Sequence, residues 1–186
     1  MTRKCKVGTL GDSSGSLTCS MYIARRWNVN SEIIPYHSFE AAADALKRKE
    51  LSCILVPAAY SNISEFIMDN KLIATEVFLE SLPPLVCVSK NTNINLHKTD
   101  KIYLHQATNS LLREINIQVD NLDVVYVNSN IEACKELIQD EDANCISITN
   151  KLCAEHFGLN IIAILRNSVI MPWVCFANKS GRCFCE

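Results

Sequence analysis

The chain has 186 residues, of which 48% are hydrophobic and 20% charged, and its formal net charge is −2. This length suits one domain or two small lobes, and this composition supports a packed core rather than a disordered chain. The slightly acidic balance gives no indication of a nucleic-acid partner, which would favour a basic surface. No stretch approaches ~18 uninterrupted apolar residues, and the N-terminal residues lack the apolar core of a signal peptide. We therefore expect a cytoplasmic protein that has no membrane partner.

In the first half of the chain, short apolar runs alternate with segments whose apolar residues recur every three or four positions. The first pattern is typical of buried strands and the second of helices. Ser38 precedes one of these helices and is a typical N-cap residue. In chain order, we predict a strand over 6–10, a helix over 17–27, a strand over 32–36, a helix over 39–49, a strand over 53–56, a short helix over 63–69, and extended segments over 72–79 and 85–89.

The second half repeats the alternation, and Gly158 suits the position just after a helix. Repeated strand–helix–strand units imply an α/β protein with mostly parallel sheets that helices cover on both faces. In chain order, we predict a strand over 101–104, a helix over 109–117, a strand over 123–127, a helix over 130–139, a strand over 144–148, a helix over 150–157, and strands over 160–166 and 174–176.

The ten cysteines are spread along the chain without any Cys-x-x-Cys spacing, and the one close pair, Cys183 and Cys185, lies in the tail. We interpret the cysteines outside the tail as small apolar side chains that remain reduced, and the tail pair as exposed thiols that can form adventitious disulfides. A zinc site needs clustered ligands, and the four histidines do not supply a matching cluster. We expect no metal, and no cofactor either, because the chain carries no glycine-rich nucleotide-binding motif.

Four loops that follow predicted strands are rich in Ser, Thr, Asn or Gly. They span 11–16, 57–61, 128–130 and 149–150. In α/β sheets, ligands bind at the carboxyl ends of strands, where helix N-termini offer backbone N–H groups to an anion. Each polar residue can instead serve only as an N-cap. Because the four loops follow strands in the same way, the pattern favours a shared site for a carboxylate.

Several segments around these loops, in this order and spacing, resemble one known family. They are GTLG at 8–11, VPAAYSNI at 56–63, LHQA at 104–107, VNSN at 127–130, ITNKLCA at 148–154 and IMPW at 170–173. Together they resemble the prephenate dehydratase-like domain, and most closely the non-aromatising prephenate decarboxylases of the bacilysin pathway.

The resemblance covers nearly the whole chain and implies an architecture. We expect two lobes of the periplasmic-binding-protein type II kind, with a ligand cleft between them. Lobe one is placed at 1–80 with 167–186, and lobe two at 81–166. The resemblance also implies a homodimer.

The resemblance further implies prephenate as the small-molecule substrate. Its pyruvyl carboxylate is then held by the polar loops, and its ring carboxylate lies against Met171 and Trp173. For Trp173, plain core packing is an equal alternative. The residues assigned to substrate binding in the loops are Ser13, Ser14, Gly15, Ser16, Ala58, Ser61, Ser129, Asn130, Thr149 and Asn150.

Two side chains are candidates for the catalytic proton donor. The resemblance places His105 at a strand end that faces the cleft, and an imidazole suits acid catalysis near neutral pH, so it is the first candidate, although a lone His is more often structural. Tyr60 is the second candidate, and an ordered water molecule is the third.

The segment 170–173 decides which reaction we predict. Dehydratases of the family use the Thr of a "TRF" motif as the acid, whereas this chain has Met171-Pro172-Trp173 there. Met and Pro have no proton to give, so we predict loss of carbon dioxide without loss of the ring hydroxyl. A non-catalytic binding module and a dehydratase with a relocated acid remain alternatives, and a transporter receptor is disfavoured by the expected lack of a signal peptide.

Overall fold

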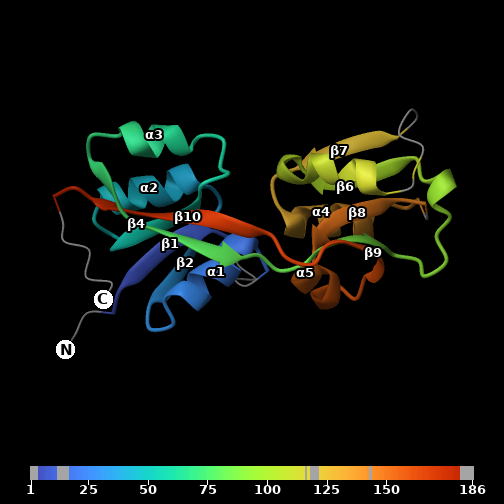
Figure 1. Cartoon of the computed structure of the whole chain (residues 1–186), viewed down its shortest axis with the longest axis horizontal. Coiled ribbons are helices and arrows are strands. Elements are labelled where there is room, and N and C mark those ends of the chain that lie inside the picture. The colour runs from blue at the N-terminus through green and yellow to red at the C-terminus, as the bar shows by residue number, and fades with distance from the viewer. Residues whose placement is uncertain (1–3, 12–16, 116, 118–121, 143, 181–186) are drawn as a thin grey trace. The chain divides into compact units, whose positions relative to one another are not determined.

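The computed structural model describes residues 4–11, 17–115, 117, 122–142 and 144–180. The chain divides into two compact units, of which the first comprises Met1–Leu82 with Ile170–Glu186 and the second Pro83–Val169. Each unit contains a five-stranded sheet (Figure 1). Among the described residues, no helix is both long enough and apolar enough to cross a membrane.

The first unit has a mixed sheet with the strand order β2-β1-β3-β10-β4. Strand β1 pairs in parallel with β2 and β3, whereas β10 is antiparallel to both β3 and β4. Helices α2 and α3 lie on one face of the sheet and α1 lies on the other (Figure 1). The elements are β1 (Lys6–Leu10), α1 (Cys19–Trp27), β2 (Glu32–Tyr36), α2 (Phe39–Lys47), β3 (Cys53–Pro57), α3 (Ile63–Met68), β4 (Leu72–Ser81) and β10 (Ile170–Asn178).

Strand β10 shows how one sheet builds two cores. Because successive side chains of a strand point to opposite faces, Trp173 and Cys175 join the cluster under α1, whereas Val174 and Phe176 join the cluster under α2 and α3. All four side chains are at least nine-tenths buried. The strand is therefore apolar without interruption, as expected for a strand covered on both faces.

The second unit repeats this plan with the strand order β7-β6-β8-β5-β9. Strand β6 pairs in parallel with β7 and β8, and β5 is antiparallel to β8 and β9. The elements are β5 (Leu85–Ser89), the 3₁₀ helix η1 (Leu96–Lys98), β6 (Lys101–His105), the 3₁₀ helix η2 (Gln106–Glu114), β7 (Asp123–Val127), α4 (Asn130–Gln139), β8 (Ile146–Asn150), α5 (Lys151–His156) and β9 (Asn160–Arg166).

The predicted alternation of strands and helices is confirmed, but two details differ. Each sheet is mixed rather than mostly parallel, because β5 and β10 run antiparallel to both of their neighbours. The predicted helix over 109–117 is a 3₁₀ helix, Gln106–Glu114, which begins directly after β6. Thr108, Leu111 and Leu112 are its buried residues. This three-to-four-residue spacing fits a 3₁₀ helix as well as an α-helix.

The cysteines are not all reduced. Cys5 is disulfide-bonded, so the prediction of a free thiol is wrong there. Sequence spacing carries no information about which cysteines meet in space. Cys19, which is half-buried, forms no disulfide. The same holds for six buried cysteines of the described residues, which are Cys53, Cys87, Cys134, Cys145, Cys153 and Cys175.

Candidate functional site

His105 is the last residue of β6 and lies at the carboxyl end of that strand. Its Nδ1 accepts a hydrogen bond from the backbone N–H of Ala107 at 3.2 Å, so the neutral ring carries its proton on Nε2. Burial lowers the pKa of the imidazole. Within the described part of the chain, Nε2 has no hydrogen-bond partner. The ring is therefore oriented by one nitrogen and leaves the other for a ligand.

Ser129 and Asn130 follow β7, the neighbour of β6. Ser129 Oγ accepts from the backbone N–H of Glu132 at 3.1 Å, and the Glu132 carboxylate accepts from the Asn128 backbone at 2.9 Å. This reciprocal pair resembles a capping box and begins α4. The Ser129 side chain thus does serve as an N-cap, as the alternative interpretation of this loop proposed.

Thr149 and Asn150 end β8, the other neighbour of β6, and both are fully buried. Thr149 Oγ1 donates to the carbonyl of Asn130 at 2.9 Å, which joins this loop to the preceding one. Asn150 Oδ1 accepts from the Cys153 backbone at 2.9 Å and caps α5. Since β7, β6 and β8 are parallel neighbours, the structure brings His105 and both loops to one edge of the second sheet.

Tyr60 belongs to the first unit and is engaged by a carboxylate. Its hydroxyl donates a short hydrogen bond to Glu40, and its ring packs on Phe39 at 4.7 Å and on Phe66 at 6.1 Å between centroids. Burial, reinforced by Glu40, raises the pKa of the phenol to about 12. Such a phenol holds its proton more tightly than an ordinary tyrosine does, which disfavours it as an acid.

The other predicted residues of this loop are placed as follows. The backbone N–H of Ala58 donates to the Pro172 carbonyl at 2.9 Å. Ser61 is exposed and its hydroxyl donates to the neighbouring Asn62 at 3.3 Å. Ser13, Ser14, Gly15 and Ser16 lie outside the described residues.

Trp173 is fully buried in the cluster under α1, where it packs with Val7, Ile23 and Leu55. This is the core-packing alternative. Met171 is half-buried at the margin of the same cluster. Neither Met171 nor Pro172 offers a proton.

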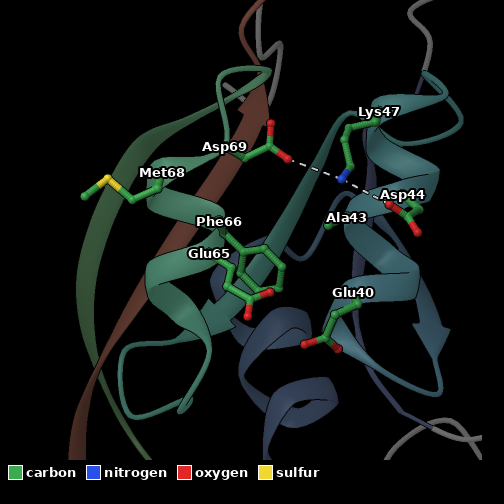
Figure 2. Close-up of a pocket in the computed structure, with 8 residues that line it drawn as sticks. All are labelled: Glu40, Ala43, Asp44, Lys47, Glu65, Phe66, Met68 and Asp69. Carbon is green, nitrogen blue, oxygen red and sulfur yellow. Dashed lines mark hydrogen bonds and ion pairs between the residues drawn. The ribbon is translucent and has the colours of Figure 1, made fainter.

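A cavity of about 330 Å³ lies between α2 and α3 (Figure 2). Lys47 bridges Asp44 at 3.0 Å and Asp69 at 3.2 Å across it. With four carboxylates against one ammonium group, the lining is negative and disfavours an organic acid. Sequence reasoning missed this cavity, although acidic residues four apart on α2 are visible in the sequence. The lining residues are Glu40, Ala43, Asp44, Lys47, Glu65, Phe66, Met68 and Asp69.

Among the described residues, one group has the spacing of metal ligands. Ligand atoms of Asp100, Asp142 and Cys145 lie within 4.8 Å of one another. However, Cys145 Sγ donates to Asp140 at 3.2 Å, and burial, with that carboxylate, raises the pKa of the thiol to about 12. The Cys145 sulfur is thus engaged as a donor to Asp140 rather than free as a thiolate ligand.

The sequence and the fold were compared with protein families and with solved structures. A model of the family described as Prephenate dehydratase matches residues 7–165. No curated protein matches the sequence. Among solved structures, a prephenate dehydratase from Arthrobacter aurescens in complex with L-Phe superposes with a TM-score of 0.70 at 16% identity. That match covers 95% of this chain but only 61% of the Arthrobacter chain.

Two further structures show how widely this fold is used. A quorum-quenching acylase, GqqA, superposes with a TM-score of 0.63 at 13% identity, covering 95% of this chain and 65% of its own. The methionine-binding protein MetQ superposes with a TM-score of 0.58 at 14% identity, covering 95% of this chain and 83% of its own. Such identities show the fold alone. They confirm the predicted two-lobed α/β architecture of the periplasmic-binding-protein kind, whereas the predicted ligand cleft stays a prediction.

Proposed function

The chain belongs to the prephenate dehydratase family, and from this membership we propose that it is a prephenate decarboxylase that leaves the ring non-aromatic. One observation carries the choice of reaction. The segment that resembles the family's "TRF" motif contains Met171 and Pro172, neither of which can donate a proton to a departing hydroxide. Without that acid, the ring hydroxyl is retained. This chain spans only about three fifths of the length of the Arthrobacter protein.

The substrate carboxylate is assigned to the edge of the second sheet. Backbone N–H groups at the start of the ten-residue helix α4 carry the positive end of the helix dipole, which favours an anion. Ser129 keeps its hydroxyl proton as a donor while its oxygen caps the helix. Thr149 fixes the backbone of Asn130 and so positions this edge. Fixed dipoles of this kind stabilise charge without reorganising during the reaction.

The proton donor is assigned to His105. When the bond between the ring and its carboxylate breaks, carbon dioxide leaves and the electron pair stays with the ring system. A ring carbon then takes a proton, and the hydroxyl remains, which gives a dihydro-4-hydroxyphenylpyruvate. We assign this proton to Nε2 of the imidazolium form of His105, because Nε2 is the nitrogen that the Ala107 backbone leaves open; when the ring is protonated, Nδ1 gives up the hydrogen bond that it accepts from Ala107 in the neutral ring. Tyr60 is the weaker candidate because of its bond to Glu40.

Incubation of the purified protein with prephenate near neutral pH tests this proposal, with products identified by mass and ultraviolet absorbance. A product that has lost carbon dioxide, retains the hydroxyl and is not aromatic is the expected result. Phenylpyruvate would show a dehydratase whose acid lies elsewhere. Unchanged prephenate together with a raised Tm would show a binding module, since a ligand that binds only the folded state stabilises it.

The product suggests the context in which the enzyme acts. A non-aromatic keto acid is suited to conversion into non-proteinogenic amino acids, so we place the reaction in cytoplasmic antibiotic biosynthesis of the bacilysin kind. The protein is proposed to work as a homodimer, and light scattering coupled to size exclusion measures that mass directly.

A further inference from the structure

Two buried cysteines of the second unit lie with their thiols in contact. Cys134 on α4 and Cys153 on α5 are both fully buried, and the two helices pack against each other. Their side chains are hydrogen-bonded to each other. Thiols in such contact need only shorten their separation to the S–S bond length of about 2.0 Å to form a disulfide. The pair is therefore a candidate for covalent modification, and neither side chain has a part in the proposed reaction.

The same pair contacts the edge that is assigned to the substrate carboxylate. The Cys134 thiol donates to Thr149 Oγ1 at 3.3 Å, and Thr149 Oγ1 in turn donates to the carbonyl of Asn130 at 2.9 Å. From α5, the backbone N–H of Cys153 donates to Asn150 Oδ1 at 2.9 Å. The two cysteines therefore contact the residues at which β8 ends and α4 begins.

The contact between the thiols also favours the reactive form of one of them. Hydrogen bonding by the Cys153 thiol lowers the pKa of Cys134, although burial opposes this effect. In contrast, burial raises the pKa of Cys87, which is fully buried in the same unit, to about 12. Since the thiolate is the form that attacks an oxidant, Cys134 is the nucleophile of the pair and Cys153 is the thiol that completes the disulfide.

We propose that Cys134 and Cys153 are a site of disulfide formation that controls how the second unit binds its organic acid. The S–S bond removes the thiol hydrogen that Cys134 donates to Thr149, and it draws α4 towards α5. Both changes act on the backbone of Asn130, to which Thr149 donates, so the oxidised protein binds the acid more weakly. The disulfide stands by itself, whereas its effect on acid binding rests on the proposed function.

Hydrogen peroxide is the oxidant that suits a buried pair, because it is little larger than a water molecule. The sulfurs become accessible to it when α5, a helix of only six residues, opens locally. The Cys134 thiolate attacks one peroxide oxygen, the O–O bond breaks, and hydroxide leaves as water with the thiol proton. The Cys153 sulfur then attacks the sulfenic sulfur, the S–O bond breaks, and hydroxide leaves as water with the Cys153 proton. Two thiols are thus oxidised to one disulfide, and one peroxide is reduced to two water molecules.

Tryptic mapping tests the disulfide in the unaltered protein. Cleavage after Lys and Arg places Cys134 in 114–135 and Cys153 in 152–166, with Cys145 alone on the peptide between them. The native protein is treated with hydrogen peroxide, and free thiols are then blocked with N-ethylmaleimide during denaturation. We expect the two outer peptides to be joined, with a mass two hydrogens below their sum, and Cys145 to be alkylated. Absence of this joined peptide, or a bond from Cys134 to Cys145, would overturn the inference.

Titration calorimetry with phenylpyruvate, an unreactive acid with the same pyruvyl group, tests the effect on binding. The Kd should rise at least ~5-fold on oxidation, as for loss of one hydrogen bond, and should return with dithiothreitol. Cys153→Ser retains a donor towards Cys134 but cannot form the S–S bond, so its Kd should not respond to peroxide. Cys87→Ala, which removes another buried thiol of the same unit, is the control and should keep the response.

The outcomes separate this inference from the proposed function. A joined peptide with the same Kd in both states would overturn the control of acid binding. A response to peroxide that persists in Cys153→Ser would assign it to another residue and would overturn the inference as well. Absence of acid binding by the reduced protein would overturn the proposed function, whereas a joined peptide in that case would still establish the disulfide.

Discussion

At the scale of single residues, the proposed chemistry depends on the protonation of His105. Burial lowers the pKa of its imidazole, so the imidazolium is the minority form at neutral pH. A lowered pKa also makes that minority form a stronger acid, which suits proton transfer to carbon.

If His105 is the donor, the pH dependence of the reaction follows. We expect kcat/KM for prephenate to fall as pH rises through a pKa below ~6.5, by roughly tenfold per pH unit above it. Steady-state rates between about pH 5 and 8 measure this. A rate that is constant across that range would exclude His105 as the titrating acid.

Replacement of His105 separates catalysis from helix capping. Asn offers a short side-chain oxygen that can accept from the Ala107 backbone, as Nδ1 does. His105→Asn should therefore lower kcat by ~100-fold with little change in Tm near pH 7, whereas His105→Ala should also lose about 1 kcal/mol of stability. An active His105→Asn enzyme would contradict the assignment.

The lowered pKa of His105 also predicts how the stability of the protein depends on pH. A histidine whose pKa is lower in the folded state binds more protons when unfolded, so its contribution is present at high pH. That contribution is lost as pH falls from ~6.5 towards the folded pKa. Thermal unfolding should show a smaller decline over this range for His105→Asn than for the unaltered chain.

For Tyr60 we expect a structural role rather than the catalytic role proposed for His105. Its hydroxyl is bound to Glu40 and its pKa is raised to about 12, so a structural role is favoured. Tyr60→Phe should lower the free energy of unfolding by about 1.5–3 kcal/mol, as for loss of a hydrogen bond to a charged group, while kcat stays within about threefold. A loss of kcat comparable to that of His105→Asn would return Tyr60 to the reaction.

At the scale of elements, the same residues can cap helices and bind an anion. An Asp residue caps a helix as well as Ser does but brings a negative charge to the N-terminus. Ser129→Asp should leave the Tm nearly unchanged and weaken prephenate binding by at least ~10-fold. Ser38→Asp is the matched control, because Ser38 is also half-buried and caps α2 by accepting from Ala41 at 3.1 Å. Equal affinities of the two variants would leave Ser129 as a cap only.

At the scale of the whole molecule, each unit depends on contacts between distant parts of the chain. In the second unit, Asp140 at the end of α4 accepts from Tyr103 at 2.6 Å, from Lys101 at 3.0 Å and from the Asp142 backbone at 2.8 Å. The tyrosine hydroxyl first, and then the other donors, hold the pKa of this carboxyl well below its usual range. These bonds join α4 to β6.

Asp140→Asn should therefore lower the free energy of unfolding by about 1.5–3 kcal/mol at pH 7. An Asp whose pKa is depressed in the folded state stabilises the fold at pH values above its unfolded pKa of ~3.9. This stabilisation is lost as pH falls below that value. The difference between the two proteins in urea unfolding should accordingly shrink as pH falls below about 4. Asp123→Asn, at an exposed carboxylate at the start of β7, is the control and should change little.

Sequence periodicity predicted most strands and helices because these patterns are local. The apolar runs over 6–10 and 53–56 mark strands, and a capping serine marks the start of α2. The direction of β10 within its sheet was not predictable in this way, since an apolar run reads the same in a parallel and an antiparallel pairing. The 3₁₀ helix after β6 was missed for a similar reason, because its apolar spacing fits either type of helix.

The candidate site divides along the same line. Motif order by itself identified the family, and the position of the loops after predicted strands indicated a shared edge for Ser129 and Thr149, because parallel neighbours end at one edge. The bond from Tyr60 to Glu40, the Asp140 network and the unpartnered indole of Trp173 were decided only by the tertiary structure. The bonds from Tyr60 to Glu40 and from Tyr103 to Asp140 join residues 20 or more positions apart, and the state of the indole depends on complete burial. A local sequence pattern encodes neither property.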